Sequence, residues 1–90
     1  MGRCSYDLIK NLEPAFSKIR KLEKIKEPKP GIFYVKSQGF LHFHTKDDKV
    51  WADIKSGADW GPPYDIPAKI TPAFLNAFVK EVKKRHAECL

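Results

Sequence analysis

Apolar residues recur at intervals of three and four along residues 11–26, the spacing of an amphipathic helix. They are Leu12, Phe16, Ile19, Leu22 and Ile25. Pro14 is compatible with this helix because proline is tolerated in a first turn, and Asn11 can then cap the N-terminus. The following stretch Glu-Pro-Lys-Pro-Gly (27–31) should end the helix, because two prolines and a glycine cannot continue it.

A second stretch of helical spacing lies near the end of the chain, over residues 72–88. Thr71 can cap this helix, with Pro72 at the first helical position, where proline is favoured. The apolar stripe consists of Leu75, Phe78, Val79, Val82 and His86. This spacing predicts a helix that packs one side against the core.

Between the two helices the pattern changes to the alternation of β-strands. Three segments show it: 32–36, 40–45 and 50–55. Residues 56–69 are rich in glycine and proline and predict a long ordered loop, with a short fourth strand at 64–68 as the alternative. The order α-β-β-β-α predicts one α+β domain over 1–90. In it, a three- or four-stranded antiparallel meander packs one face against both helices.

The alternation also predicts the register of the second and third strands. Pairing across the turn Lys-Asp-Asp-Lys places the apolar residues of both strands on one face, whereas a shift by one residue would set Phe43 against Asp53. On the other face, His42 then lies opposite Asp53 and His44 lies opposite Trp51. The two histidines and the aspartate should therefore be neighbours.

The first two strands are predicted to be joined by the three-residue turn Ser-Gln-Gly, with Gly39 in the left-handed conformation. This turn sets Tyr34 opposite His42 and Lys36 opposite Phe40. All four residues then share the outer face of the sheet, and Tyr34 and His42 form a row with the aspartate of the third strand.

Two hypotheses place chemistry on this face. His42, His44 and Asp53 form a set of two imidazoles and one carboxylate, which can hold Zn²⁺ or Fe²⁺. The same residues suggest an acid–base enzyme, in which Asp53 orients His42 and raises its pKa. The strands carry no serine or cysteine nucleophile, and the sequence has no glycine-rich phosphate loop and no pair of catalytic carboxylates. Enzymatic chemistry is therefore disfavoured.

The leading hypothesis is a non-enzymatic binding module that uses the outer face of the sheet. Aromatic and cationic side chains on an open sheet can hold a small anionic ligand, a base or a protein partner, including a second copy of the chain. The candidate residues are Tyr34, Lys36, His42, His44, Trp51, Asp53 and Trp60. The competing interpretation is a satisfied hydrogen-bond network packed under residues 56–69.

The net charge of +6 adds a third hypothesis, a nucleic-acid partner. Charges balance over residues 31–69, so the basic excess belongs to the two predicted helices. A nucleic-acid binder would therefore use these basic helices, unless they are only solvated surfaces.

Cysteine usage and the lack of long apolar runs predict a soluble, cytoplasmic protein with no membrane contact. Cys4 and Cys89 lie near opposite ends of the chain and are predicted to be free thiols in a reducing compartment. A bridge between them is the alternative, because chain termini are often close together.

The strings Phe-Tyr-Val-Lys-Ser-Gln-Gly-Phe-Leu-His-Phe-His and Ala-Asp-Ile-Lys resemble a pattern in small microbial proteins without a known activity. That group pairs a Phe-x-His-Phe-His strand with an Ala-Asp-x-Lys strand. The resemblance covers residues 31–80 and leaves out the lysine-rich N-terminal helix. It implies that the hairpin is a shared feature, and it assigns no role to any residue.

Overall fold

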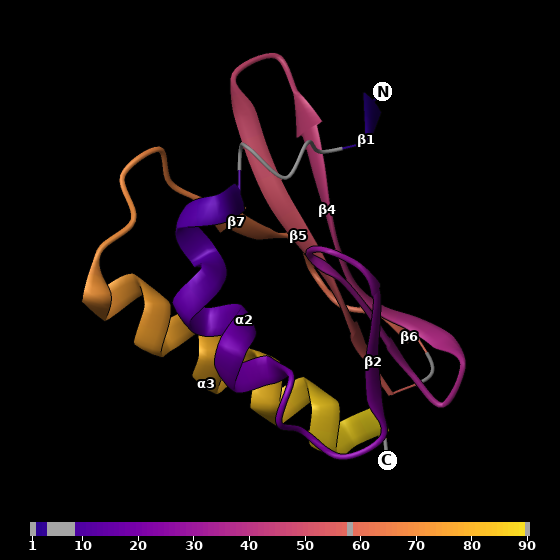
Figure 1. Cartoon of the computed structure of the whole chain (residues 1–90). Helices are drawn as coiled ribbons and strands as arrows, with labels where there is room; N and C mark the ends of the chain where they lie inside the picture. Colours follow the sequence, from indigo (N-terminus) through magenta and orange to yellow (C-terminus); the bar gives the residue numbers. More distant parts are fainter. Residues whose placement is uncertain (1, 4–8, 58, 90) are drawn as a thin grey trace.

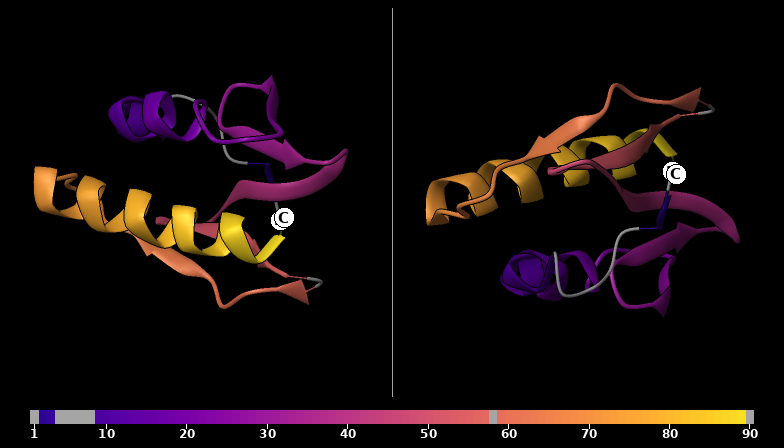
Figure 2. Two further views of the ribbon diagram at one scale, coloured as in Figure 1. Left: turned by 90° about the horizontal axis from the view of Figure 1, so that it is seen from below. Right: turned by 90° about the horizontal axis from the view of Figure 1, so that it is seen from above.

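Two helices pack on one side of a curved antiparallel sheet in the computed structural model, which describes residues 2–3, 9–57 and 59–89 (Figure 1). The elements are β1 (Gly2–Arg3), the 3-10 helix η1 (Lys10–Leu12), α2 (Glu13–Ile19), β2 (Ile25–Lys29), β3 (Ile32–Val35), β4 (Gln38–Lys46), β5 (Lys49–Ser56), β6 (Asp59–Trp60), β7 (Tyr64–Ile66) and α3 (Pro72–Cys89). Seen from below and from above, the strands curve around the two helices, which lie next to each other (Figure 2). The predicted α+β fold is confirmed.

The sheet has more strands than the three or four predicted from the sequence. Its order is β2-β3-β4-β5-β6, with β1 beside β4 and β7 beside β5. The alternative of a short strand near 64–68 is confirmed by β7, so the predicted loop over 56–69 is interrupted by β6 and β7. The reason is that 64–66 pair with 50–52 along the free edge of β5, which places Tyr64 against the ring of Phe78.

The N-terminal helix is shorter than the predicted span of 11–26. Helical structure covers Lys10–Ile19 as η1 and α2, with Pro14 in the first turn as expected and no side-chain cap from Asn11. At Lys24 the backbone turns through a positive φ of 58°. The chain then returns as β2, where Ile25 pairs with Val35. Ile25 still packs against the core, which explains why its distance in sequence from Leu22 fitted the apolar spacing of a longer helix.

The C-terminal helix agrees closely with its predicted span of 72–88. The hydroxyl of Thr71 accepts a hydrogen bond from the backbone N–H of Phe74 at 3.1 Å, as expected of an N-cap. Four residues of the predicted stripe are buried, and Leu75 is half-buried. The ring of His86 lies 2.7 Å (Nε2) from the carbonyl oxygen of Glu23, so the last turns of α3 hold the segment that leads into β2.

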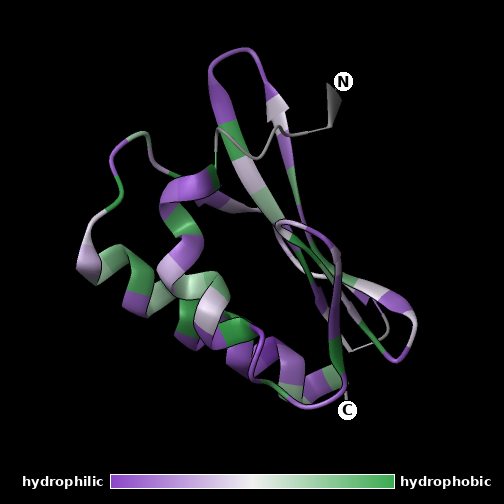
Figure 3. Cartoon of the chain, viewed as in Figure 1, coloured by the Kyte–Doolittle hydropathy of each residue, from purple (hydrophilic) through white to green (hydrophobic). Residues whose placement is uncertain are grey.

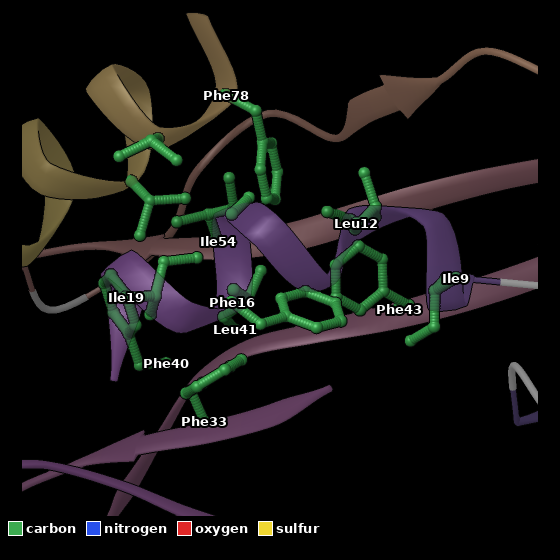
Figure 4. Packing of buried hydrophobic residues seen from close by; sticks show 14 of the residues in the cluster. Ile9, Leu12, Phe16, Ile19, Phe33, Phe40, Leu41, Phe43, Ile54 and Phe78 are labelled. Carbon is green, nitrogen blue, oxygen red and sulfur yellow. The ribbon is translucent and has the colours of Figure 1, made fainter. Parts of the chain in front are cut away.

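The core fills the space between the helices and the inner face of the sheet (Figure 4). Its largest fully buried side chains are Phe16, Phe33, Phe40, Phe78, Leu12, Ile19, Leu41, Ile54 and Val82. Phe16 of α2 contacts the rings of Phe33 and Phe43 at centroid distances of 5.7 Å. Burying each such ring contributes about 1.5–3 kcal/mol. The tip of the β4–β5 hairpin, away from this core, is hydrophilic (Figure 3).

The predicted register of the first hairpin is wrong. Tyr34 pairs with Gly39, not with His42. The turn has two residues, Lys36 and Ser37, both with positive φ (52° and 69°), as a type I′ turn requires. A sequence without glycine at these positions gave no signal for this turn, and Gly39 suggested a longer one.

The strand β4 contains a bulge at Phe40, which changes the face on which this residue lies. Phe33 pairs with Leu41 and Tyr34 with Gly39, so Phe40 is an extra residue on its strand. Phe40 was predicted to lie outside, but it is fully buried and contacts the ring of His86. The bulge sends two neighbouring apolar residues into the core, which a strict alternation cannot do.

The register of the second hairpin is confirmed from Leu41 to Lys46. The expected pairing of Phe40 with Lys55 is wrong, because the bulge places Phe40 in the core. His42 pairs with Asp53, His44 with Trp51 and Thr45 with Val50. The pair Lys46↔Lys49 closes a two-residue loop. The alternation is regular beyond the bulge, so the two histidines and the aspartate lie on the face opposite the core.

Candidate functional site

Three polar side chains converge on the outer face of the hairpin, and we call them the His–Asp cluster: His42, His44 and Asp53. Nε2 of His44 lies 2.9 Å from Oδ2 of Asp53, and Nε2 of His42 lies 3.8 Å from the same oxygen. One ligand atom from each residue falls within 4.8 Å of the other two. No other group of histidine, cysteine and carboxylate side chains comes this close in the part of the chain that the structure describes.

The His–Asp cluster lies between two tryptophans, the only two in the chain. The ring of Trp60 meets the ring of His42 edge-on at 4.7 Å, and Trp51 stacks on His44 at 5.7 Å. We call the cluster and these two tryptophans together the outer face. The side chains of His42, His44 and Asp53 keep 33%, 21% and 26% of their surface exposed, so solvent reaches all three.

Trp60 reaches the cluster because β6 folds back along the end of β5. Lys55 pairs with Trp60, and the N–H of Gly61 donates to the carbonyl oxygen of Ile54 at 2.9 Å. The indole then lies over Gly39, where a Cβ atom would sit 3.6 Å from the ring. A glycine inside a strand often marks such a close approach. This was the one signal in the sequence that could have revealed the role of Gly39.

The electrostatics of the cluster differ from the prediction that Asp53 raises the pKa of His42. Burial lowers the pKa of His42, the neighbouring His44 lowers it further, and the opposing effect of Asp53 is smaller. The reason is geometric, since Asp53 lies closer to His44 than to His42. Asp53 therefore partners His44, and the hypothesis of an acid–base enzyme stays a prediction.

Tyr34 and Lys36 do not join the cluster, although both were candidate site residues. The register of the first hairpin moves Tyr34 toward the turn, where it is 39% exposed. Lys36 lies in that turn and lines a small pocket that also includes Lys55 and Cys89. The Nζ atom of Lys55 lies 5.8 Å above the ring of Trp60, so this lysine places a cation beside the aromatic part of the outer face.

Arg85 supports the outer face from the opposite side of the sheet. It is 8% exposed, and its Nη1 donates to the carbonyl oxygens of Ile54 and Pro62 at 3.2 Å each. Its Nε donates to Glu81 at 2.6 Å. A Cβ on Gly61 would lie 2.7 Å from Nη1, so only glycine leaves room for this contact. In the sequence, Arg85 is indistinguishable from the other charges of a basic run.

The remaining predictions from the sequence concern the cysteines and membrane contact. The predicted alternative of a bridge between Cys4 and Cys89 involves Cys4, which lies outside the described residues. The thiol of Cys89 donates to the carbonyl oxygen of Lys55 at 3.6 Å. None of the described helices is long and apolar enough to cross a membrane.

Comparison of the chain with models of protein families, with curated proteins and with solved structures finds no match. The geometry of the outer face is therefore the basis for a proposed function.

Proposed function

We propose that this chain is a non-enzymatic binding module that takes a small anionic ligand with a flat unsaturated ring on its outer face. The observation that carries the proposal is the position of both tryptophans of the chain on either side of a solvent-exposed His–Asp cluster. Trp60 leaves 47% of its surface exposed, so the face of its ring is accessible to a flat ligand.

The charges around Trp60 favour an anion. Lys55 lies over the ring and is half-buried. It also lines a small pocket that Lys36 borders. The chain as a whole carries a net charge of +6, which attracts anionic ligands at long range. Indole rings stack on flat ligands, and imidazole N–H groups donate to oxyanions. The outer face therefore combines a stacking surface with cationic and donor groups.

The proposal is tested by titrating the ¹⁵N-labelled protein with adenosine 5′-monophosphate and with 1-naphthoate. Adenosine and 1-naphthamide serve as the uncharged counterparts. The indole N–H signals of Trp51 and Trp60 report directly on the outer face. We expect at least one anion to shift both signals in a saturable way, and its uncharged counterpart to bind more weakly.

Two variants complete this test. Trp60→Ala should weaken binding by about tenfold or more, because a stacking contact contributes ~1–3 kcal/mol. Tyr34→Ala is the matched control, since Tyr34 is an exposed aromatic residue displaced from the cluster. If neither anion binds, or if both variants weaken binding equally, the proposed small ligand is wrong. Broadening of the tryptophan signals with protein concentration alone would instead indicate a second copy on this face.

A second candidate, nucleic-acid binding through the basic helices, is favoured by one observation. The contact between His86 and Glu23 brings two lysine-rich segments together. Their exposed lysines are Lys18, Lys21, Lys24, Lys26, Lys80, Lys83 and Lys84. This candidate predicts that affinity for duplex DNA falls steeply with salt and is unchanged in Trp60→Ala. Affinity lost in Trp60→Ala would assign the binding to the outer face.

A further inference from the structure

We propose that the His–Asp cluster is a binding site for a divalent transition metal ion, with Zn²⁺ as the best fit. The proposed ligands are Nε2 of His42, Nε2 of His44 and a carboxylate oxygen of Asp53. The inference rests on the proposed function, because the bound ion would hold the anionic group of the ligand on the outer face. It deepens that function by naming what recognises the anion.

The spacing of the three donor atoms carries the proposal. Donor atoms ~2.0–2.1 Å from a tetrahedral zinc ion lie about 3.3 Å from one another. The separations of 2.9 Å and 3.8 Å from Asp53 Oδ2 lie on either side of this value. All three atoms already fall within 4.8 Å of one another. Small side-chain rotations would therefore suffice to bring the donors to coordinating distance.

The backbone register explains why these donors face a common point. His42 and His44 lie two residues apart on β4, so both imidazoles project from the same face of the strand. Asp53 lies directly opposite His42 on β5. The pairing of these two strands, regular from Leu41 to Lys46, fixes the three side chains on a rigid element. Sites built on paired strands are held more precisely than sites on loops.

The chemistry of the donor set selects a class of metal. Two imidazole nitrogens and one carboxylate suit Zn²⁺, Fe²⁺ and related transition ions. Mg²⁺ and Ca²⁺ prefer sites made entirely of oxygen, so one carboxylate should not hold them here. Zinc is the best fit because it accepts three protein ligands with a fourth position left open.

The open position links the metal to the proposed ligand. The cluster keeps between 21% and 33% of each side chain exposed, so an incoming anion can reach an ion held there. Trp60 and Trp51 flank the two histidines and would stack on the ring of that anion. A carboxylate or phosphate oxygen would fill the fourth position, while the flat part of the ligand lies against an indole.

The test uses the full-length chain without a histidine tag, freed of metal by a chelator and titrated with Zn²⁺ in a calorimeter. We expect one ion per chain with micromolar or tighter affinity, and no heat with Mg²⁺. His44→Ala and Asp53→Asn should each weaken zinc binding by about tenfold or more. Asp65→Asn is the matched control, because Asp65 is exposed and pairs with Trp51 in the row next to Asp53, yet lies outside the cluster.

The third histidine of the chain provides an internal control. His86 is buried on the other side of the sheet and contacts the carbonyl oxygen of Glu23. The imidazole ¹⁵N signals of His42 and His44 should therefore move on addition of Zn²⁺, while those of His86 stay in place. Titration with Co²⁺ adds an optical readout, since a tetrahedral site gives a much stronger visible band than an octahedral one.

Repeating the anion titrations with and without Zn²⁺ separates failure of this inference from failure of the proposed function. Zinc that binds equally well to wild-type protein and to the His42→Ala/His44→Ala double variant would overturn the metal site. If the anion then still binds the metal-free protein and depends on Trp60, the proposed function stands without a metal. If Zn²⁺ binds at the cluster but no anion binds in either state, the metal site stands and the proposed ligand is wrong.

Discussion

At the scale of single residues, His42 has the most altered environment on the outer face. It is half-buried beside Trp60, close to a second imidazole, and farther from Asp53 than His44 is. Each of these neighbours changes the balance between the neutral and the protonated ring. The sequence predicted His44 and Asp53 as neighbours of His42 correctly. It did not predict which of the two has the larger influence on the pKa of His42, because a two-residue alternation gives the faces of a strand and not distances.

The pKa of His42 in metal-free protein should lie below its ordinary value of 6.5. Removing His44 (His44→Ala) should raise it, and removing the charge of Asp53 (Asp53→Asn) should lower it further. These shifts can be measured from the imidazole carbon signals during an NMR pH titration in the presence of a chelator. A midpoint at or above 6.5 in the wild-type protein would contradict the proposed environment.

This lowered pKa also gives the sign of a stability change. The unfolded chain binds more protons than the folded one between the folded-state pKa of His42 and 6.5. The free energy of unfolding should therefore fall as the pH drops through this window and level off below it. Urea unfolding at a series of pH values measures the effect. His42→Asn should lack this component, whereas an unchanged slope in His42→Asn would assign it to other groups.

Gly39 provides a second prediction at this scale, because Trp60 lies over it. Gly39→Ala should be tolerated, since the added Cβ would make an ordinary contact at 3.6 Å. Gly39→Leu should displace the indole and weaken anion binding by about tenfold, the contribution of a stacking contact. The indole signal of Trp60 in each variant reports its position. Equal binding by both variants would mean that Trp60 does not need its place over Gly39.

At the scale of elements, strands with a regular alternation of apolar and polar residues were predicted correctly. Segments in which this alternation is interrupted were not. The β4–β5 register followed from the match of Phe43 with Ala52 and the penalty for placing Phe43 against Asp53. The first hairpin failed because the bulge at Phe40 and a turn without glycine leave no signature in the pattern. The N-terminal helix was overextended because Ile25 packs on the same core from a strand. The sequence therefore predicted only the part of the candidate site that lies on the regular β4–β5 hairpin.

The turn between β3 and β4 contains a residue in an unfavourable backbone conformation, which lowers the free energy of unfolding. Ser37 adopts a φ of 69°, a left-handed conformation that is unfavourable for a residue with a side chain. Ser37→Gly should therefore raise the free energy of unfolding by about 0.5–1 kcal/mol, measured by urea denaturation. The same change at Asp48, in the other two-residue loop but without a positive φ, should give no gain. Similar effects at both positions would contradict this account of the turn.

At the scale of the whole molecule, Arg85 links the C-terminal helix to the binding surface. Its guanidinium group, on α3 and on the core side of the sheet, holds the carbonyl oxygens of Ile54 and Pro62. These two residues lie on either side of β6, which carries Trp60. The position of an exposed aromatic ring on the outer face thus depends on a buried cation from the opposite layer. The position of Trp60 is therefore set by the packing of α3 as well as by the segment that contains β6.

Replacing Arg85 with methionine should therefore affect both stability and binding. Arg85→Met leaves the carbonyl oxygen of Pro62 without this donor and should cost about 1–3 kcal/mol in the free energy of unfolding. In a Trp51→Phe background, the fluorescence of Trp60 should shift to the red and become more accessible to acrylamide. Anion affinity should fall although the hydrogen bonds of Arg85 go to Glu81, Ile54 and Pro62, which do not belong to the outer face.

Lys84→Met is the matched control for that substitution, because it removes the same charge from the next residue of α3, where the side chain is exposed. It should change stability by less than about 0.5 kcal/mol and leave Trp60 unaltered. If Arg85→Met and Lys84→Met behave alike, the loss of positive charge would explain both, and Arg85 would have no positioning role. If Arg85→Met lowers stability while the fluorescence of Trp60 stays unchanged, the guanidinium group supports the core alone and β6 holds its tryptophan independently.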